Sequence, residues 1–386
     1  MISGIDSTTY RLGNLDKYQA KLNFQMSGKQ LQYGSDDSVT FGRLVHTQDQ
    51  IRLNEGIVNQ LNRAKVLNDN SDSTINEIKK IMDKINEELI KANTSTTGVE
   101  GLEAIAQQLV GYKQSLMDLG NTQTEGQYLF AGSDASVKPF SMDTNGKVTY
   151  HGDSQLRKMA VDDGSYHQRG VNGIDILTFV ANTAYANGTL TFKDGDKIVD
   201  QDGNEWVLDT ATNQIEKTRW DGSKEVLTAV PPVPPVPPAS EYSVDLTTLG
   251  DGIRFDARRS TFDMLDDAIK SLRGLDDLGN PAFPGDEAAN YAFRREGISQ
   301  AVDDIKKVID SAVIAHADLG GRNKTFETAL DRLSSKIVQL NIVDTELGSS
   351  NLTDVAMQLK SLEISYTAMY STVNKTFELS LVNFMR

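Results

Sequence analysis

The sequence predicts an α+β protein in which long paired N- and C-terminal α-helices form a coiled-coil bundle and a β-rich outer domain is inserted between them. Two observations support this fold class. All nine prolines fall between Pro139 and Pro284, and an interior proline costs a helix about 3 kcal/mol. In both proline-free ends, apolar residues recur at alternating spacings of three and four, which places them in one line along a helix.

The N-terminal arm, residues 1–138, carries several such apolar lines. Each line requires a partner helix that covers it. The lines are Leu12, Leu15, Tyr18 and Leu22; then Leu44, Ile51 and Val58; then Ile75, Ile78, Met82, Ile85 and Leu89; and finally Leu102, Ile105, Leu109, Tyr112, Leu116 and Leu119.

The middle segment, residues 139–261, changes to a β pattern. Asp-Gly or Asn-Gly pairs occur at residues 145–146, 163–164, 194–195, 202–203 and 221–222, and these residues accept the positive φ of tight hairpin turns. Short strands are expected at 189–192, 197–199, 205–208 and 225–227. The run Val230–Pro238 predicts an extended polyproline II spacer. A ligand for an SH3-like domain is the alternative, but flanking basic residues are lacking.

The C-terminal arm has the longest apolar lines. One line runs from Ile298 to Leu319, resumes after Gly320-Gly321 and continues from Phe326 to Leu340. The last line begins at Leu352, and a second stripe of Met357, Ile364 and Ala368 lies on another face of the same helix. A helix that is apolar on two faces needs partners on two sides.

These lines suggest three domains and an assembly interface. The expected domains are residues 1–40 plus 350–386 as terminal coiled-coil segments, residues 41–138 plus 262–349 as a helical rod, and residues 139–261 as the outer β-rich domain. Residues 350–386 hold three basic and three acidic side chains, so this end is a neutral, apolar surface of the kind found at interfaces. The expected interface residues are Leu12, Leu15, Tyr18, Leu22, Leu352, Val355, Leu359, Leu362, Tyr366, Met369, Val373, Phe377 and Phe384.

The composition argues against several classes of function. A net charge of -15 argues against binding to nucleic acid or to anionic membrane surfaces, because both need a basic face. The sequence contains no run of 18 apolar residues, so no membrane-spanning helix is expected. The chain has no cysteine, which removes disulfides and thiolate sites. Residues 1–10 have no basic cluster or apolar run, so no cleaved signal peptide is expected.

No pattern of catalytic or metal-binding residues stands out. The histidines at 46, 151, 167 and 316 are too scattered for metal-ligand spacing, and His316 lies within a helical seam, which predicts a packed or interface histidine. The aspartates at 194, 196, 200 and 202 could suggest a calcium loop, but the glycine and glutamate positions do not match it. Hairpin turns explain these aspartates better. No phosphate loop, dinucleotide fingerprint or nucleophile elbow occurs. We therefore expect no enzyme activity, no metal and no cofactor.

Three sequence elements are distinctive. The first is Met26-Ser27-Gly28-Lys29 followed by Ser35-Asp36-Asp37, the second is GQYLFAGSDASVKPF at residues 126–140, and the third is the C-terminal helix from Leu352 onward. These elements resemble those of the flagellin superfamily, and within it of the hook-associated junction proteins, although Ser38 replaces the proline that the family has after the first element. The resemblance covers residues 1–140 and 262–386 and does not extend to the middle segment.

The resemblance implies a structural adaptor at the bacterial flagellar hook-filament junction. In that family the terminal segments pair as coiled helices in the core of a tubular assembly, and the inserted domain faces outward. The implied partners are copies of the same chain, a second hook-associated junction protein, flagellin, and an export chaperone on the C-terminal helix. Subunits of this family leave the cell unfolded through the flagellar type III apparatus, without a cleaved signal. The implied location is extracellular, on the flagellum.

Three other functions are considered. Flagellin, the filament subunit, shares the coiled ends, although the LFAG element at residues 129–132 and the modest length favour the junction family. A signalling or adhesin coiled coil would be expected to show a membrane span or signal peptide. An enzyme in the β-rich insert is supported only by the aspartate-rich turns. A further hypothesis is that residues 1–40 and 350–386 are poorly ordered in the monomer and fold on joining neighbours, since isolated helices are marginal.

Overall fold

The computed structural model describes residues 2–95, 97–185, 187–219, 222–231, 241–247, 253–276 and 279–384, without the side chains of 2–8 and 376–384. The chain forms two compact units. The terminal unit comprises residues 1–60, 162–164 and 328–386, and the central unit comprises residues 61–161 and 165–327. The three-domain division expected from the sequence stays a prediction.

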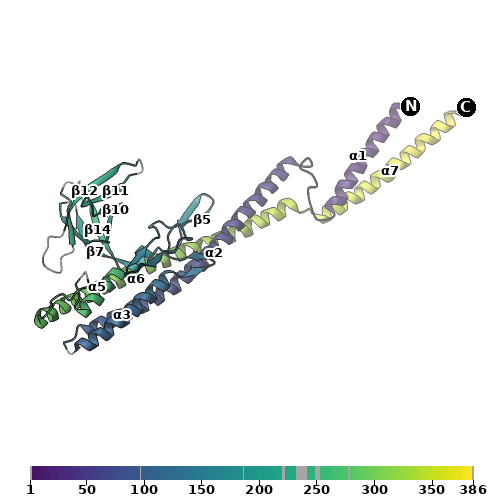
Figure 1. Ribbon diagram of the computed structural model, residues 1–386. Helices are drawn as coiled ribbons and strands as arrows, with labels where there is room; N and C mark the ends of the chain where they lie inside the picture. The colour runs from purple at the N-terminus through teal and green to yellow at the C-terminus, as the bar shows by residue number, and fades with distance from the viewer. Residues whose placement is uncertain are drawn as a thin grey trace. The chain divides into compact units, whose positions relative to one another are not determined.

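Long helices form both arms, as expected for an α+β protein with helical ends. The N-terminal arm contains α1 (Ile2–Gln25), α2 (Ser38–Ala92) and α3 (Val99–Gly120). The C-terminal arm contains α5 (Thr261–Arg273), α6 (Glu287–Gly348) and α7 (Leu352–Phe384), all labelled in Figure 1. Helix α6 continues without a break through Gly320 and Gly321. Each apolar line of the sequence therefore lies on a helix, and the fold class is confirmed.

The sequence element at residues 27–38 ends one helix and begins the next. Asp37 caps α2, because its carboxylate accepts the backbone N–H groups of Val39 and Thr40, both at 3.1 Å. Asp36 holds the preceding turn by accepting the N–H groups of Gln32 and Tyr33. Ser38 is the first residue of α2, a position that suits proline because its N–H has no partner inside the helix. The loss of the family's proline therefore leaves the cap intact.

Within the central unit, α2 and α6 run antiparallel and are joined by polar side chains. The buried Asn68 donates a hydrogen bond to Asn323 at 2.7 Å, and Lys65 pairs with Glu327 at 3.1 Å. Half-buried His316 contacts Asp72 through Nε2 at 2.7 Å. His316 is thus a packed seam residue, as expected from its place in the apolar line. A buried polar pair of this kind helps to fix the register of two packed helices.

One apolar core joins the helices of the central unit to the short segment that follows α3. Its members include Ile75, Met82 and Leu109 of α2 and α3, and Leu265 and Ile305 of α5 and α6. Phe140, Val148 and Leu177 also belong to this core. The outer β-rich domain expected from residue 139 onward thus shares its first 40 residues or so with the helical core.

The sequence element at residues 126–140 forms a loop fixed by part-buried polar contacts. Tyr150 donates a hydrogen bond to the carbonyl of Phe130 at 2.9 Å, and Asp153 accepts the N–H of Ser133 at 2.8 Å. Gly132 has a φ of 89°, and a Cβ there would lie 2.1 Å from the Asp153 carboxylate. Only glycine fits this position, which gives a physical reason for the GS dipeptide in the element.

The middle of the chain forms short hairpins and one large antiparallel sheet. The hairpins are β1 (Gln123–Thr124) with β2 (Gln127–Tyr128), β3 (Phe140–Met142) with β4 (Val148–Tyr150), and β5 (Lys158–Asp162) with β6 (Ser165–Gln168). A single-turn helix, α4 (Gly173–Leu177), leads into the large sheet. The large sheet has the strand order β7-β14-β9-β10-β11-β12-β13-β8. Its strands are β7 (Thr178–Tyr185), β8 (Thr189–Lys193), β9 (Lys197–Asp200), β10 (Glu205–Asp209), β11 (Gln214–Thr218), β12 (Lys224–Val230), β13 (Glu241–Asp245) and β14 (Arg254–Ser260).

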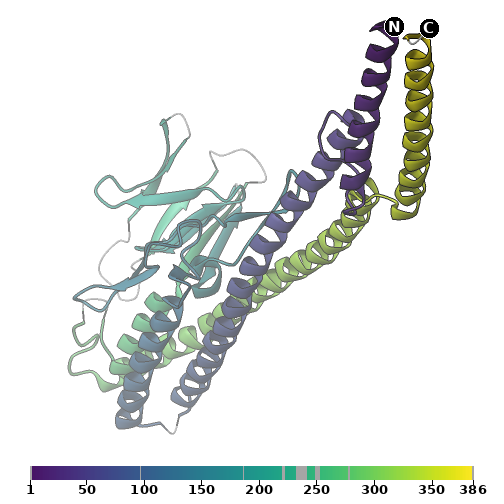
Figure 2. The same cartoon turned by 90° about the vertical axis from the view of Figure 1, so that its right-hand side faces the viewer.

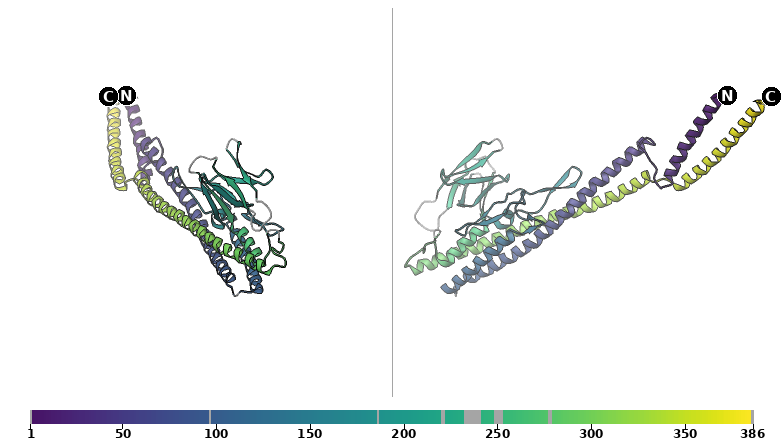
Figure 3. Two further views of the ribbon diagram at one scale, coloured as in Figure 1. Left: turned by 90° about the vertical axis from the view of Figure 1, so that its left-hand side faces the viewer. Right: turned by 45° about the vertical axis from the view of Figure 1, so that its right-hand side comes forward.

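The large sheet curls, so that its two end strands lie together; we refer to it as the curled sheet. Its end strands β7 and β8 are in contact, and Asn182 of β7 donates to the carbonyl of Thr191 in β8 at 2.9 Å. Phe192, Trp206, Ile215 and Phe255 are buried on its inner face. Figure 3 shows the curled sheet beside the helices of the same unit.

Four strands of the curled sheet were expected and four were not. Strands β8, β9, β10 and β12 confirm the expected positions, and the turn glycines at 146, 164, 195, 203 and 222 all have positive φ. Strands β7, β11, β13 and β14 were not expected. In β14, arginines and an aspartate alternate with the buried Phe255 and Ala257, so its apolar content is low. Of the predicted polyproline segment, the part after Pro231 lies outside the described residues. Asp221, which belongs to one of the expected turns, also lies outside them.

Candidate assembly interface

The two chain ends meet in the terminal unit, where α1 and α7 lie side by side. Figures 1 and 2 show both helices running to the same end, where the N and C termini are marked. The linkers at the other end of the two helices are tied together. The N–H of Gln30 donates to the carbonyl of Gly348 at 2.8 Å, and the N–H of Ser350 donates to Gly28 at 3.1 Å. The backbone therefore brings the first and last segments of the chain into one helix pair.

The side chain of Asn351 starts α7. Its Oδ1 accepts the N–H of Thr353 at 3.1 Å and that of Asp354 at 3.4 Å, which satisfies donors that have no partner inside the helix. Asp354 lies in the first turn, where a negative charge interacts favourably with the helix dipole. The start of α7 is thus fixed by local sequence.

A small apolar core holds α1 against α7. Leu22, Val355 and Leu362 are buried in it, and Leu15, Leu359 and Tyr366 pack against them. All six were expected as interface residues. The pairing of the N- and C-terminal helices expected from the sequence is therefore seen here, since α1 and α7 cover each other along one face. The pair therefore combines contacts within the chain with faces that remain open.

Two tyrosines add polar contacts across the pair. Tyr18 donates to Gln358 Oε1 at 2.8 Å. Tyr366 donates to Asp16 Oδ1 at 2.5 Å, and this hydrogen bond raises the pKa of Tyr366 to about 12. Both contacts are solvent-exposed, so they position the helices more than they stabilise them.

The other expected interface residues are less enclosed. Leu12, Met369 and Val373 are half-buried, and Leu352 is 49 % exposed. Phe377 and Phe384 fall within the span of α7, but their side chains are outside the described part of the structure. The structure thus brings together six of the expected residues and leaves Leu352 facing solvent.

The outer face of α7 carries large apolar side chains that contact solvent. Met357 and Ile364 are exposed by 60 % and 65 %. Tyr370, which is 56 % exposed, lies about 120° around the helix from Ile364 and stacks on Tyr366. Nine residues separate Val355 from Ile364, which is two and a half turns of about 3.6 residues, so the two side chains point to opposite sides of the helix. The second stripe recognised in the sequence, which includes Met357, Ile364 and Ala368, is therefore an exposed face.

Further exposed apolar residues were not predicted from the sequence. Tyr10 of α1 is 73 % exposed, and Val338 and Ile342 of α6 are 59 % and 55 % exposed. Val338 and Ile342 are four residues apart on one helix face. They could have been recognised in the sequence as an apolar pair on a different helix face from Leu333, Ile337 and Leu340. Together these residues extend the apolar surface of the terminal unit beyond α7.

The terminal unit is also nearly neutral in its helical segments. Residues 1–60 contain six basic and six acidic side chains, and residues 328–386 contain five basic and six acidic side chains, so most of the net charge of -15 resides elsewhere. A neutral surface with exposed large apolar groups is typical of a protein–protein contact area.

No metal-binding or membrane-spanning element accompanies this surface in the described part of the chain. Across the residues that the structure describes, no three or more histidine, aspartate or glutamate side chains are grouped to hold a metal ion. The described helices include none with the length and apolarity needed to cross a membrane.

The chain was compared with known families, curated proteins and solved structures. No family model matches. The sequence is 26 % identical over 325 residues to flagellar hook-associated protein 3 of Salmonella typhimurium, and this match covers 83 % of the present chain and 92 % of that protein. The fold is similar to that of flagellar hook-associated protein 3 from Legionella pneumophila, with a TM-score of 0.53, 17 % identity, and coverage of 78 % of this chain and 98 % of that one.

The resemblance to hook-associated protein 3 is confirmed. The FlgL protein of Xanthomonas campestris is also similar, with a TM-score of 0.49, 18 % identity, and coverage of 77 % of this chain and 98 % of that one.

Proposed function

We propose that this protein is a structural adaptor subunit at the hook-filament junction of the bacterial flagellum. The observation that carries the proposal is the exposed apolar face of the α1–α7 pair in a chain that resembles hook-associated protein 3. The role is structural and requires no catalysis or cofactor. The proposed location is the extracellular flagellum.

The proposed mechanism is assembly through the outer face of the terminal helix pair. Leu22, Val355 and Leu362 hold α1 to α7 within one subunit, and the opposite face, with Met357 and Ile364, contacts neighbouring subunits. Burying such side chains contributes about 1.5–3 kcal/mol each. Neighbours would be copies of this chain, a second junction protein and flagellin.

We also propose that the terminal helices become fully ordered only on assembly. Among the side chains that the structure describes, the apolar core between α1 and α7 contains three that are buried, whereas most helix stability comes from packing of an apolar face. Export through the type III apparatus without a cleaved signal, and protection of α7 by a chaperone, follow the family's pattern and fit a helix with two apolar faces. Amide exchange at residues 9–25 and 352–375 should be rapid in the dilute monomer and slow in the assembly. Full protection in the monomer would contradict this part of the proposal.

A deletion strain tests the adaptor role. Cells without this protein should build intact hooks, lack filaments and release flagellin into the medium, and a plasmid copy of the gene should restore filaments. If the protein is instead flagellin, the deletion strain would release no other filament subunit, and the wild-type filament would contain this chain along its whole length. Counting copies per flagellum by quantitative mass spectrometry separates a thin layer from a filament.

A further inference from the structure

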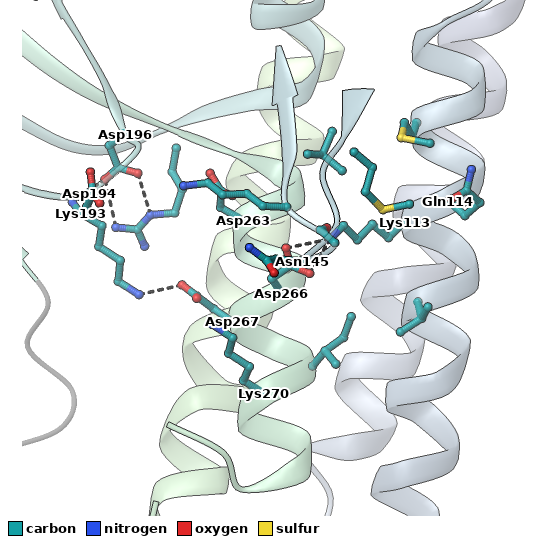
Figure 4. A pocket seen from close by; sticks show the side chains of 18 of the residues that line it. Lys113, Gln114, Asn145, Lys193, Asp194, Asp196, Asp263, Asp266, Asp267 and Lys270 are labelled. Atoms are coloured by element: carbon teal, nitrogen blue, oxygen red, sulfur yellow. Dashed lines mark hydrogen bonds and ion pairs between the residues drawn. The ribbon is translucent and has the colours of Figure 1, made fainter. Parts of the chain in front are cut away.

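Two cavities of the central unit differ in the balance of their charges. The larger one, of about 660 Å³, is lined by six basic and five acidic side chains, and Figure 4 shows how these side chains face one another. Three ion pairs cross it, namely Arg259–Asp196, Lys193–Asp267 and Lys113–Asp266. Its lining is therefore close to neutral and leaves little charge for a ligand.

The smaller cavity, of about 20 Å³, is lined by two arginines and by no acidic residue. It lies where the loop at residues 126–140 and the base of the β5–β6 hairpin meet α2. Arg157 comes directly before β5 and Arg169 directly after β6, so the hairpin brings both arginines to the same place. In a chain with a net charge of -15, a cavity with only positive charge in its lining is unexpected.

Neither arginine forms an ion pair with any residue that the structure describes. Arg157 donates through Nε to the carbonyl of Ser133 at 2.6 Å, and Arg169 donates through Nη2 to Gln127 Oε1 at 3.4 Å. A guanidinium group has five N–H donors and no acceptor, so most of these donors have no acceptor among the described residues. The carboxylate of Asp134 interacts with Arg157 only from a longer distance.

The two positive charges also disfavour each other. Both side chains are half-buried. Burial lowers the pKa of Arg169, and the nearby charge of Arg157 lowers it further. A partly desolvated charge beside a like charge is unfavourable unless a counter-charge is supplied. The surroundings of Arg169 therefore favour a bound anion.

The neutral groups of the lining do not supply that counter-charge. Asn68 Oδ1 accepts the N–H of Gly170 at 3.0 Å, and the hydroxyl of Ser71 donates to the carbonyl of Leu67 at 2.9 Å. Leu67 and Val171 are buried and form an apolar part of the wall. The N–H groups of the two arginines are thus the principal donors that remain for a ligand.

The size of the cavity limits the ligand to a single small particle. About 20 Å³ is slightly more than the roughly 10–15 Å³ that one water molecule requires. A monoatomic anion such as chloride fits this space, whereas a tetrahedral oxyanion such as sulfate is too large. Chloride only accepts hydrogen bonds, and this suits a site whose charged groups can only donate them.

We propose that this cavity binds one chloride ion between the guanidinium groups of Arg157 and Arg169. The ion neutralises the repulsion between the two arginines and accepts hydrogen bonds from both. Because Arg157 and Arg169 stand at the two ends of the β5–β6 hairpin, the bound ion ties the base of this hairpin to the loop at residues 126–140 and to α2.

Amide exchange of the full-length protein at constant ionic strength tests the proposal. Sodium chloride is replaced stepwise by sodium gluconate, whose anion is too large for the cavity. The reporters are the N–H of Arg169, which donates to the carbonyl of Arg157 at 2.8 Å, and the N–H of Gly170. Binding to one site divides their opening equilibrium by one plus the ratio of chloride concentration to Kd. Between about 10 mM and about 1 M chloride, the opening equilibrium should fall by about fivefold or more. Bromide should have the same effect, and sulfate should have none.

Four variants locate the site. Arg157→Gln and Arg169→Gln each remove one guanidinium group and should reduce the fall to less than about twofold. Arg169→Lys keeps the charge and should retain part of the response. Arg273→Gln is the matched control, because Arg273 lies on α5 and pairs with Glu103 at 2.9 Å, and it should respond as the wild type does. Each variant is compared with its own value at low chloride, so a general loss of stability does not imitate a loss of binding.

Crystals of the wild-type protein soaked in bromide give an independent measurement of position. An anomalous scattering peak is expected beside the guanidinium groups of Arg157 and Arg169. An opening equilibrium that does not depend on chloride, an equal response in Arg169→Gln and the wild type, or no bromide peak at this position would overturn the proposal.

Discussion

The ion pair between Lys113 and Asp266 gives a quantitative prediction about what holds the helices of the central unit together. Lys113 is 7 % exposed. Its ammonium group donates to both oxygens of Asp266 and to the carbonyl of Gly146 at 2.6 Å, so its three donors have three acceptors. The contact therefore links α3, α5 and the β3–β4 hairpin.

Lys113→Met keeps the unbranched side chain, one heavy atom shorter, and removes its charge. Asp266 is then left without its cation, and the carbonyl of Gly146 loses a donor. Breaking a buried pair costs about 3–5 kcal/mol, and the lower end applies because the Asp266 side chain is 29 % exposed. We expect a loss of about 3 kcal/mol, which is a factor of about 150 in the opening equilibrium of α3 and α5.

The assay is native-state amide exchange at pH 7 on Lys113→Met, Asp266→Leu and the double variant. The double variant should lie within about 1 kcal/mol of the wild type, because no charge is left unpaired. Lys306→Met is the control: Lys306 and Asp303 form an exposed pair, which contributes well below about 1 kcal/mol. Additive losses in the double variant, or an effect of Lys113→Met no larger than that of Lys306→Met, would refute the reasoning.

Two further predictions concern buried polar groups. Burial alone would raise the pKa of Asp200, but hydrogen bonds from Lys217, Asn204 and Trp206 outweigh it and lower the pKa to about 2. The ionised carboxylate therefore stabilises the folded protein by about 2 kcal/mol above pH 4, and this stabilisation is lost as the pH falls toward 2. In urea unfolding at pH 7, Asp200→Asn should be less stable than the wild type by that amount, and its free energy of unfolding should change less as the pH falls. Equal stability of the two proteins would be inconsistent with this. Asn68→Leu removes the hydrogen-bond partner of Asn323 and of the N–H of Gly170. Measured by amide exchange, this should destabilise the α2–α6 contact by about 2 kcal/mol. A neutral or stabilising change would show that the polar pair only sets the register of the two helices.

The helical part of the fold was predictable because its signal is local. Lines such as Ile75, Ile78, Met82, Ile85 and Leu89 repeat the helical period over several turns, and the chain ends lack proline. Turns with Asp-Gly pairs were also predictable, since positive φ depends on the residue itself. Strand β14 was not, because its buried Phe255 and Ala257 alternate with charged residues.

The contacts between distant segments were harder to predict. The sequence predicted that the terminal helices pair and marked Leu15, Leu22, Val355, Leu359, Leu362 and Tyr366 as apolar. It could not show which of the two apolar faces of α7 is covered by α1. It also could not show which bases pair with Asp196, Asp266 and Asp267, because these bases lie up to about 150 positions away in the chain. The spacing of apolar residues identifies the apolar faces of helices, whereas the residues that cover each face are known only from the folded structure.

The central claim is that the outer face of α7 is an assembly surface, and one pair of variants tests it most directly. Ile364→Asp places a charge on that face, opposite the core formed by Val355 and Leu22, whereas the control Ser365→Asp places the same charge on an adjacent exposed position. In deletion strains supplied with each variant, the measured quantity is the fraction of hooks that carry filaments. We predict that Ile364→Asp abolishes filaments and that Ser365→Asp retains them at the wild-type level. Normal filaments with Ile364→Asp would contradict the claim.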